Sequence, residues 1–243
     1  MVYMGIFSIF NRKQSLSETG CFEGGTDCHS HVLYGVDDGI KTSEDSLAVL
    51  AYLEKLGLKD LWCTPHIMED IPNTSENLKI RFGELCSSYK GKIKLHLAAE
   101  YMIDNLLETR LMEDDLLLMD GGQLLVETST ANPPIVMNEI LEEIQKKGYY
   151  PLLAHPERYR YLKLPDYEKL AGKGIRFQLN LPSLMGYYGE TARGKAEWLL
   201  EQGLYSYAGS DCHRYSALTM QYEAKELNRK ILSDLNDLLH AKM

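Results

Sequence analysis

Apolar residues along the chain fall into two alternating patterns. Short continuous apolar runs, typical of buried strands, are separated by longer stretches in which apolar residues recur with helical spacing. The predicted strands are 26–30, 60–64, 93–98, 123–127, 149–154, 175–180 and 204–209. The predicted helices lie between Thr42 and Gly57, near 75–89, near 104–112, at 134–147, near 166–172, near 190–202 and near 217–240. Alternation of this kind predicts an α/β fold with a parallel sheet and covering helices, either open or closed into a barrel.

Histidines and carboxylates gather at the carboxyl ends of these strands. The first strand runs into His29 and His31, whose spacing of two projects both side chains to the same side of an extended chain. The other strand ends deliver His66, Glu100, Glu127, His155, Asp211 and His213. In an α/β barrel the loops that follow the strands converge at this rim and build the active site. Burying so many imidazoles and carboxylates is costly without partners, and divalent cations are the natural compensation, so the sequence predicts a metal site.

Composition and charge narrow the class of protein. The chain has 243 residues with a formal charge of −9 and no lysine-rich run, which disfavours a general nucleic-acid binder. Its five cysteines are odd in number and scattered, which fits a reducing compartment and a cytoplasmic protein rather than a disulfide framework.

The N-terminal part differs from the rest. Residues 1–13 (MVYMGIFSIFNRK) are apolar and end in two positive charges, the reverse of the order in a secretory signal. They are either a segment on the outside of the fold or a peripheral membrane or partner contact. Residues 14–25 are rich in glycine and polar groups, so we expect 1–25 to be a leader and linker and 26–243 to be a single domain.

Several common catalytic motifs are missing from the sequence. The cysteine phosphatases need an arginine six positions after the nucleophile, but none of the five cysteines has one. There is also no GxxxxGK[ST] loop and no GxGxxG fingerprint. These observations exclude the cysteine mechanism and the usual nucleotide-binding sites.

An ordered set of motifs resembles a known family. DCHSHVLYGVDDG, TPHI, AAE, LLVET, AHPERY, SLMGYYG and GSDCH occur in the order found in the PHP (polymerase and histidinol phosphatase) superfamily. More narrowly, they resemble the CpsB/YwqE-type bacterial protein-tyrosine phosphatases of polysaccharide operons. The resemblance spans about residues 26–235 and implies a distorted seven-stranded (β/α) TIM-like barrel, the PHP fold, with its metal site at the C-terminal rim.

The resemblance also implies which residues hold metal. It implies three divalent ions, manganese in the family, although imidazole and carboxylate ligands also suit iron or zinc. The first ion takes His29, His31, Glu100 and Asp211; Glu100 bridges to a second held also by Glu127 and His155; the third takes Asp38, His66 and His213.

Two arginines are candidates for binding phosphate. Arg158 follows His155 by three residues and could present its planar fork to a phosphoryl group, although a surface ion pair is the alternative. The arginine that family members place several residues after the DxH motif is not at that spacing here, and Arg214 is its candidate substitute.

These observations favour a metal-dependent phosphomonoesterase. The resemblance implies a tyrosine phosphatase that acts on the tyrosine-rich tail of a capsule or exopolysaccharide kinase. Three alternatives remain open at this point: a small-molecule phosphatase similar to histidinol phosphatase, an amidohydrolase, and a catalytically silent, metal-stabilised docking protein.

Overall fold

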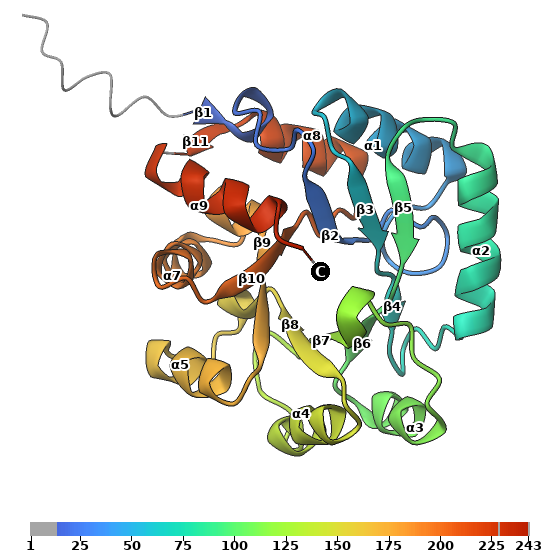
Figure 1. Ribbon diagram of the computed structural model, residues 1–243, viewed down its shortest axis with the longest axis vertical. Helices are drawn as coiled ribbons and strands as arrows, with labels where there is room; N and C mark the ends of the chain where they lie inside the picture. Colours follow the sequence, from blue (N-terminus) through green and yellow to red (C-terminus); the bar gives the residue numbers. More distant parts are fainter. Residues whose placement is uncertain (1–13, 228, 243) are drawn as a thin grey trace, which may run out of the picture.

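Parallel strands form a ring that is enclosed by helices (Figure 1). The computed structural model describes residues 14–227 and 229–242, so the apolar segment 1–13 lies outside the described residues. Within the described part, one sheet has the order β10 (Tyr205–Gly209), β9 (Arg176–Asn180), β8 (Tyr150–Ala154), β7 (Gln123–Glu127), β6 (Glu100–Met102) and β4 (His66–Ile67). A second parallel sheet has the order β2 (Thr26–Ser30), β3 (Asp60–Cys63) and β5 (Lys94–Leu97). The predicted mixed α/β fold with parallel sheets is confirmed.

Two of the expected strands are each followed at once by a further short strand. The strand expected at 60–64 is β3, and β4 begins after Pro65, which has no N–H to donate to a neighbouring strand. The strand expected at 93–98 is β5, and β6 begins at Glu100. The pairing register is the same in both pairs of strands, with Cys63 opposite Leu97 in one and His66 opposite Glu100 in the other. A histidine and a glutamate therefore lie directly opposite each other at the rim.

The ring closes where β2 meets β10. Ser30 and Cys212 form an isolated parallel bridge. The N–H of His31 donates to the carbonyl of Cys212 at 3.1 Å, and the N–H of Asp211 donates to the carbonyl of His29 at 2.8 Å. His29, the first candidate ligand along the chain, is thus joined by a backbone hydrogen bond to Asp211, which lies near the end of the chain.

Helices follow most of the strands, as predicted. They are α1 (Ser43–Lys55), α2 (Ser75–Ser88), α3 (Asn105–Glu113), α4 (Met137–Lys146), α5 (Leu164–Gly172) and α7 (Glu190–Glu201). The Thr42 side chain accepts from the N–H of Asp45 and caps α1, as its position in the sequence suggests. Short elements that the sequence did not indicate are α6 (Leu181–Leu184) and the 3-10 turns η3 (Asp120–Gly122) and η4 (Pro156–Arg158). Among the described residues, no helix is both long and apolar enough to cross a membrane.

The prediction of one terminal helix near 217–240 is wrong. The segment contains α8 (Tyr215–Glu223), strand β11 (Lys225–Leu227) and α9 (Arg229–Leu239). β11 pairs antiparallel with β1 (Gln14–Ser15), and Leu227 is fully buried. The helical pattern is interrupted because a segment from the other end of the chain supplies strand pairing, a long-range contact that local periodicity does not record.

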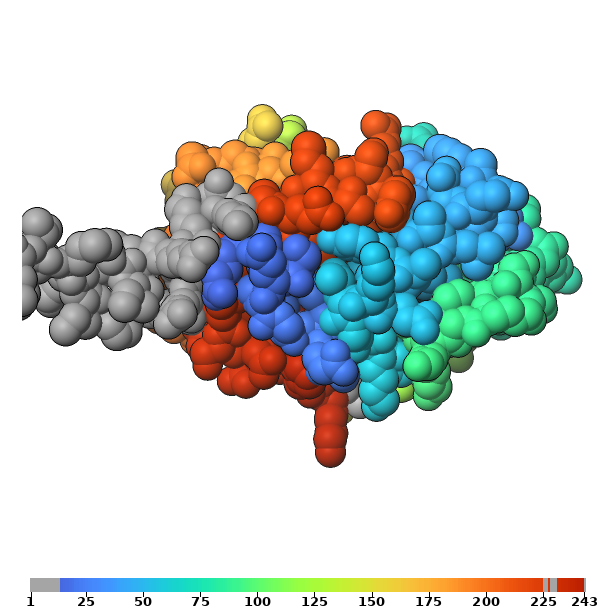
Figure 2. All heavy atoms as spheres, turned by 90° about the horizontal axis from the view of Figure 1, so that it is seen from above, coloured from blue at the N-terminus to red at the C-terminus, as the bar shows by residue number. Residues whose placement is uncertain are grey.

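The segment expected to be a linker is packed into the fold. After β1 it forms the 3-10 turn η2 (Leu16–Glu18), and Leu16 and Phe22 are buried. The Phe22 ring stacks on Tyr222 of α8 with 5.1 Å between the ring centroids. In Figure 2 this blue segment lies against the red C-terminal elements. Residues 14–25 therefore contribute to the core together with the last helices.

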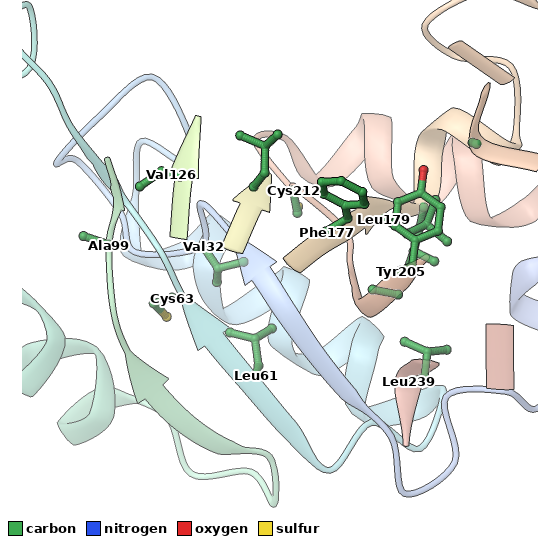
Figure 3. Packing of buried hydrophobic residues seen from close by; sticks show 14 of the residues in the cluster. Val32, Leu61, Cys63, Ala99, Val126, Phe177, Leu179, Tyr205, Cys212 and Leu239 are labelled. Carbon is green, nitrogen blue, oxygen red and sulfur yellow. The ribbon is translucent and has the colours of Figure 1, made fainter. Parts of the chain in front are cut away.

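Alternate residues of the strands pack on opposite sides of the ring. The larger apolar cluster, part of which is drawn in Figure 3, fills the space between strands and helices and includes Leu61, Cys63 and Val126. A smaller cluster contains Cys28, Trp62, Leu125, Leu152, Ala154 and Tyr207, among others. Successive side chains of a strand point to opposite faces, and successive residues of β3 and β7 belong alternately to the two clusters. Since the larger cluster lies on the helix side, the smaller cluster lies inside the ring. This inner packing supports the rim on which the polar site is built.

Candidate metal centre

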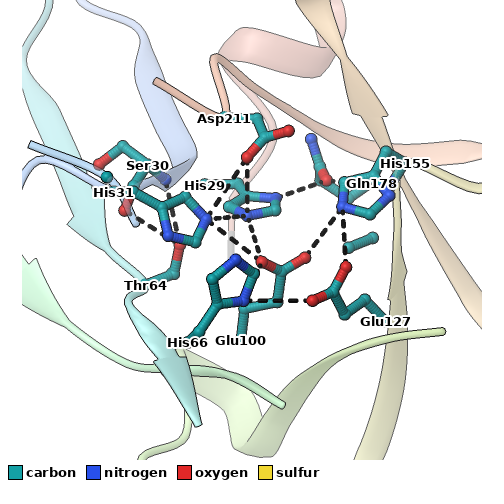
Figure 4. A network of polar contacts seen from close by, with 12 residues as sticks. His29, Ser30, His31, Thr64, His66, Glu100, Glu127, His155, Gln178 and Asp211 are labelled. Atoms are coloured by element: carbon teal, nitrogen blue, oxygen red, sulfur yellow. Dashed lines mark hydrogen bonds and ion pairs between the residues drawn. The ribbon is translucent and has the colours of Figure 1, made fainter. Parts of the chain in front are cut away.

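The nine candidate ligands lie together at the carboxyl-terminal rim of the strands. They come from the end of β2 and the loop after it, the starts of β4 and β6, the end of β7, and the segments after β8 and β10. Figure 4 shows seven of them, converging from strands on all sides of the ring. Each of the nine has a side-chain atom within 3.7 Å of another member of the set. The nine are His29, His31, Asp38, His66, Glu100, Glu127, His155, Asp211 and His213.

The first group of ligand atoms is completely enclosed. It comprises His29, His31, Glu100 and Asp211, and its ligand atoms all lie within 4.8 Å of one another. Nε2 of His29 and Nε2 of His31 each lie 3.2 Å from Oε2 of Glu100. Their distances to Oδ1 of Asp211 are 3.6 and 3.4 Å. Two imidazoles and two carboxylates facing one point are a ligand set that manganese, iron and zinc accept.

Glu100 lies between this group and a second one. Its Oε1 atom is 3.0 Å from Nε2 of His155, and its Oε2 atom is 3.2 Å from Nδ1 of His66. Glu127 completes the second group, 3.2 Å from Nδ1 of His66 and 3.7 Å from Nε2 of His155. Glu100 thus has a carboxylate oxygen directed at each group.

The hydrogen bonding of Glu100 tests whether a cation fits here. Its Oε2 atom is fully buried and has three histidine nitrogens at 3.2 Å, yet it makes no hydrogen bond within the described part of the chain. Nδ1 of His66 is likewise buried and makes no hydrogen bond among the described residues. Buried polar atoms are normally hydrogen-bonded. Here the histidine nitrogens and the carboxylate oxygen lie close together without hydrogen-bond geometry, which is how ligand atoms are arranged around a cation.

The third group is more open. Oδ1 of Asp38 lies 3.5 Å from Nε2 of His66 and 3.4 Å from Nε2 of His213. His31 also lies close enough to share a cation with these three. The Asp38 side chain is 66% exposed, whereas the carboxylates of the first group are buried. This group is therefore more open to solvent than the first group.

Residues that the sequence did not assign hold several of the ligands in place. Nδ1 of His31 lies 2.8 Å from Oδ2 of Asp37. Nδ1 of His29 lies 2.9 Å from Oε1 of Gln178, which also accepts from the N–H of His155 at 3.2 Å. Such partners fix which ring nitrogen of a histidine is free to bind metal. Asp37 had a signal, the aspartate pair before Gly39, whereas Gln178 lies within strand β9 and had none.

Two of the candidate ligands have left-handed backbone conformations, which are unfavourable for residues other than glycine. His155 has φ of 33° and Asp211 has φ of 50°. Hydrogen bonds hold both, from the N–H of His155 to Gln178 and from the N–H of Asp211 to His29. Strain of this kind persists where the surroundings fix a residue for function.

The charges of the cluster are set by mutual contact. Burial opposes ionisation of Glu100, but positive charge on His29 and His66 holds its pKa well below the usual value. Burial likewise opposes charge on His29, but Glu100 and Asp211 raise its pKa to about 9. The buried carboxylates thus favour the charged form of His29, and a cation bound here would compete with that proton.

Both candidate arginines line a cavity beside this cluster. The cavity has a volume of about 390 Å³, and three of the candidate ligands, Asp38, Asp211 and His213, are among its lining residues. Nη1 of Arg158 lies 2.9 Å from Oδ2 of Asp211, and its guanidinium carbon lies 4.2 Å from the centre of the Tyr188 ring. Arg214 is exposed at the cavity edge.

Comparison with known proteins gives a consistent result. The sequence matches the family described as "Capsular polysaccharide synthesis, CpsB/CapC" over residues 25–241. It is 29% identical to the tyrosine-protein phosphatase YwqE of Bacillus subtilis (strain 168) over 194 residues, which cover 77% of this chain and 76% of YwqE. It is 26% identical to the tyrosine-protein phosphatase CpsB of Streptococcus pneumoniae over 240 residues, which cover 86% of this chain and 98% of CpsB.

Solved structures share the fold. One comes from the crystal structures of YwqE from Bacillus subtilis and CpsB from Streptococcus pneumoniae, described as unique metal-dependent tyrosine phosphatases. It superimposes with a TM-score of 0.71 at 24% identity, covering 88% of this chain and 93% of the other. The lactonase Lmo2620 from Listeria monocytogenes has a TM-score of 0.54 at 13% identity, covering 96% of this chain and all of the lactonase. At these identities the structural likeness describes the fold alone.

Proposed function

The chain belongs to the CpsB/CapC family of capsular polysaccharide synthesis proteins, and we propose that it is a metal-dependent protein-tyrosine phosphatase. The family match confirms the resemblance to CpsB/YwqE-type proteins that the motifs indicated. The relatives YwqE and CpsB are both named tyrosine-protein phosphatases, which supports this activity over that of a small-molecule phosphatase.

One structural observation carries the proposal. Three histidine nitrogens surround Oε2 of Glu100 at 3.2 Å without hydrogen-bond geometry, next to a cavity lined by two arginines. A cation-binding cluster beside a cavity with two guanidinium groups in its lining is suited to a phosphate ester.

We assign the cluster to three divalent ions, of which manganese is our choice. His29, His31, Glu100 and Asp211 would hold the first, and Glu100, Glu127 and His155 the second. Asp38, His66 and His213 would hold the third, with His31 and His66 close enough to serve neighbouring ions. When bound, the ions would lower the pKa of a water molecule and offset the charge of the phosphoryl oxygens.

The chain's own residues orient the phosphate. Arg158 contacts both Asp211 and the Tyr188 ring, and its side chain is only 23% exposed. Its guanidinium is therefore already held in position before a substrate binds. A planar guanidinium can donate two hydrogen bonds to one phosphoryl group. Arg214 at the cavity edge would add a second positive charge.

The partner we propose is the phosphotyrosine tail of a bacterial capsule kinase. We further infer that β3 with β4, and β5 with β6, act as single interrupted strands, which gives the seven-stranded barrel expected from the sequence. The unbroken register from Cys63 opposite Leu97 to His66 opposite Glu100 supports this inference.

The activity is tested with two substrates on the same metal-loaded preparation. We expect a phosphotyrosine peptide to be hydrolysed with a far higher kcat/KM than histidinol phosphate. A preference for histidinol phosphate would replace the proposal with a small-molecule phosphatase. Full metal occupancy without turnover of either substrate would indicate a docking protein.

A further inference from the structure

The cavity beside the metal cluster has an aromatic wall that the phosphatase chemistry does not use. Besides Asp38, Asp211 and His213, its lining includes Pro182, Tyr187, Tyr188, Ala217 and Leu218, among others. The wall contains two adjacent tyrosines from the turn between α6 and α7. A site that needed only to bind phosphate would require polar groups alone, so this apolar side calls for an explanation of its own.

The two tyrosines have different surroundings. Tyr188 is half-buried, and its ring lies under the Arg158 guanidinium at 4.2 Å. Tyr187 is 51% exposed and meets Tyr188 edge to face, with ring centroids 5.1 Å apart and an interplanar angle of 90°. Tyr188 therefore supports both the arginine and the neighbouring ring, while Tyr187 keeps accessible ring surface at the cavity.

The backbone at this turn fixes the pair. Gly186 and Gly189 flank the tyrosines, and both have positive φ, 74° and 88°. Such values strain residues with a side chain, so the turn depends on glycine at both ends. The N–H of Gly189 donates to the carbonyl of Gly186 at 3.0 Å and closes the turn. The position of Tyr187 is thus set by the turn and by the ring of Tyr188.

We infer that Tyr187 is a specificity residue that receives the aromatic ring of the phosphotyrosine while the phosphoryl group lies between Arg158 and the metal cluster. The inference rests on the proposed function. An aryl phosphate has a rigid apolar ring next to its phosphoryl group. Arg158 and the accessible ring of Tyr187 line the same cavity, with the ring of Tyr188 in contact with both. Alkyl phosphates, such as phosphoserine, have no ring to pack there.

Binding of two phosphonates tests the inference without any turnover. Phenylphosphonate and methylphosphonate carry the same acid group and differ in the ring. With the metal-loaded protein, titration calorimetry should show that Tyr187→Ala reduces the preference for phenylphosphonate over methylphosphonate by about 2- to 12-fold, the usual range for an aromatic pair. Tyr187→Phe should retain the preference, because the ring rather than the hydroxyl makes the contact.

Tyr150 provides a matched control. It is an exposed tyrosine, 47% accessible, and it also lies under an arginine, Arg176, at 4.5 Å, but it does not line this cavity. Tyr150→Ala should leave the ratio of the two affinities unchanged. The inference is overturned if Tyr187→Ala also leaves that ratio unchanged, or if Tyr150→Ala changes it equally. Failure of the proposed function gives a different result, a wild-type protein that binds phenylphosphonate but hydrolyses no phosphotyrosine peptide.

Discussion

Oδ2 of Asp37 contacts two candidate ligands at once: it lies 2.8 Å from Nδ1 of His31 and accepts the N–H of His66 at 3.0 Å. His31 follows β2 and His66 begins β4, so one carboxylate aligns residues from two sheets. A carboxylate on the far nitrogen of a histidine fixes the ring and makes the metal-facing nitrogen a better ligand.

Asp37→Asn should therefore weaken metal binding by about 10- to 100-fold while the nine candidate ligands remain. The measurement is competition against a chelator of known affinity. Asp60→Asn is the control, since Asp60 also contacts a histidine, His96 at 2.7 Å, but has no contact with the cluster. Equal metal affinity in Asp37→Asn and wild type would contradict this role for Asp37.

Chelation should abolish hydrolysis of an aryl phosphate, and manganese should restore it, because the ions supply the activated water. Alkylation of thiols should leave most of the activity. Cys86 is exposed, while Cys63 and Cys212 are buried, and burial raises the pKa of both buried thiols and keeps them unreactive. Full activity after complete metal removal, verified by elemental analysis, would end the metallohydrolase proposal.

Glu100→Gln should lower metal content more than His213→Ala. Glu100 is buried and contacts four histidines, His29, His31, His66 and His155, whereas His213 belongs to the open group. Glutamine keeps the size of the side chain but removes the charge that faces two groups. Ions counted per chain in both variants provide the measurement, and an unchanged count in Glu100→Gln would rule out the bridging assignment.

Arg158→Ala should keep its metal and its fold but lose about 2–4 kcal/mol of transition-state stabilisation, a fall of roughly 30- to 800-fold in kcat/KM. Arg158→Lys should recover part of the loss, because an ammonium keeps the charge but not the planar fork. If Arg158 is only an ion-pair partner of Asp211, the alanine variant will instead melt at a lower temperature with near-normal turnover.

Phe22→Ala should destabilise the protein by about 3–5 kcal/mol, because the side chain is 1% exposed and stacks on Tyr222. Ile80→Ala, at a site that is 61% exposed, should change the free energy of unfolding by less than about 0.5 kcal/mol. Urea titration measures both. A negligible effect of Phe22→Ala would show that residues 14–25 are indeed only a linker.

The positions of strands and candidate ligands could be predicted because they depend on local patterns. A buried run such as 123–127 ends in a residue that cannot be buried unpaired, and Glu127 lies at that end in the structure. The capping signal at Thr42 and the glycine stop at Gly57 likewise act within one helix, so α1 appears where it was expected.

Features that depend on distant residues were not predictable in this way. Leu227 lies in a stretch with helical spacing, but it becomes part of a strand because Gln14 pairs with it. Gln178 resembles an ordinary strand residue until folding places it beside His29. Asp37 and Asp38 look equivalent in sequence, and only the fold directs one to His31 and the other to solvent.

The pairing of β1 with β11 constrains how the protein is made. A ribosome produces Gln14 about 200 residues before its partner Leu227, and domains generally fold as units during synthesis. Leu16 and Phe22 therefore have no complete burial site until the last helices emerge. Asp211 also emerges late, so through most of translation the first group has Glu100 but lacks its second carboxylate. A nascent chain stopped near residue 205 would carry both histidines of the first group without Asp211 and without a closed ring, so this four-residue group is completed only late in the protein's biogenesis.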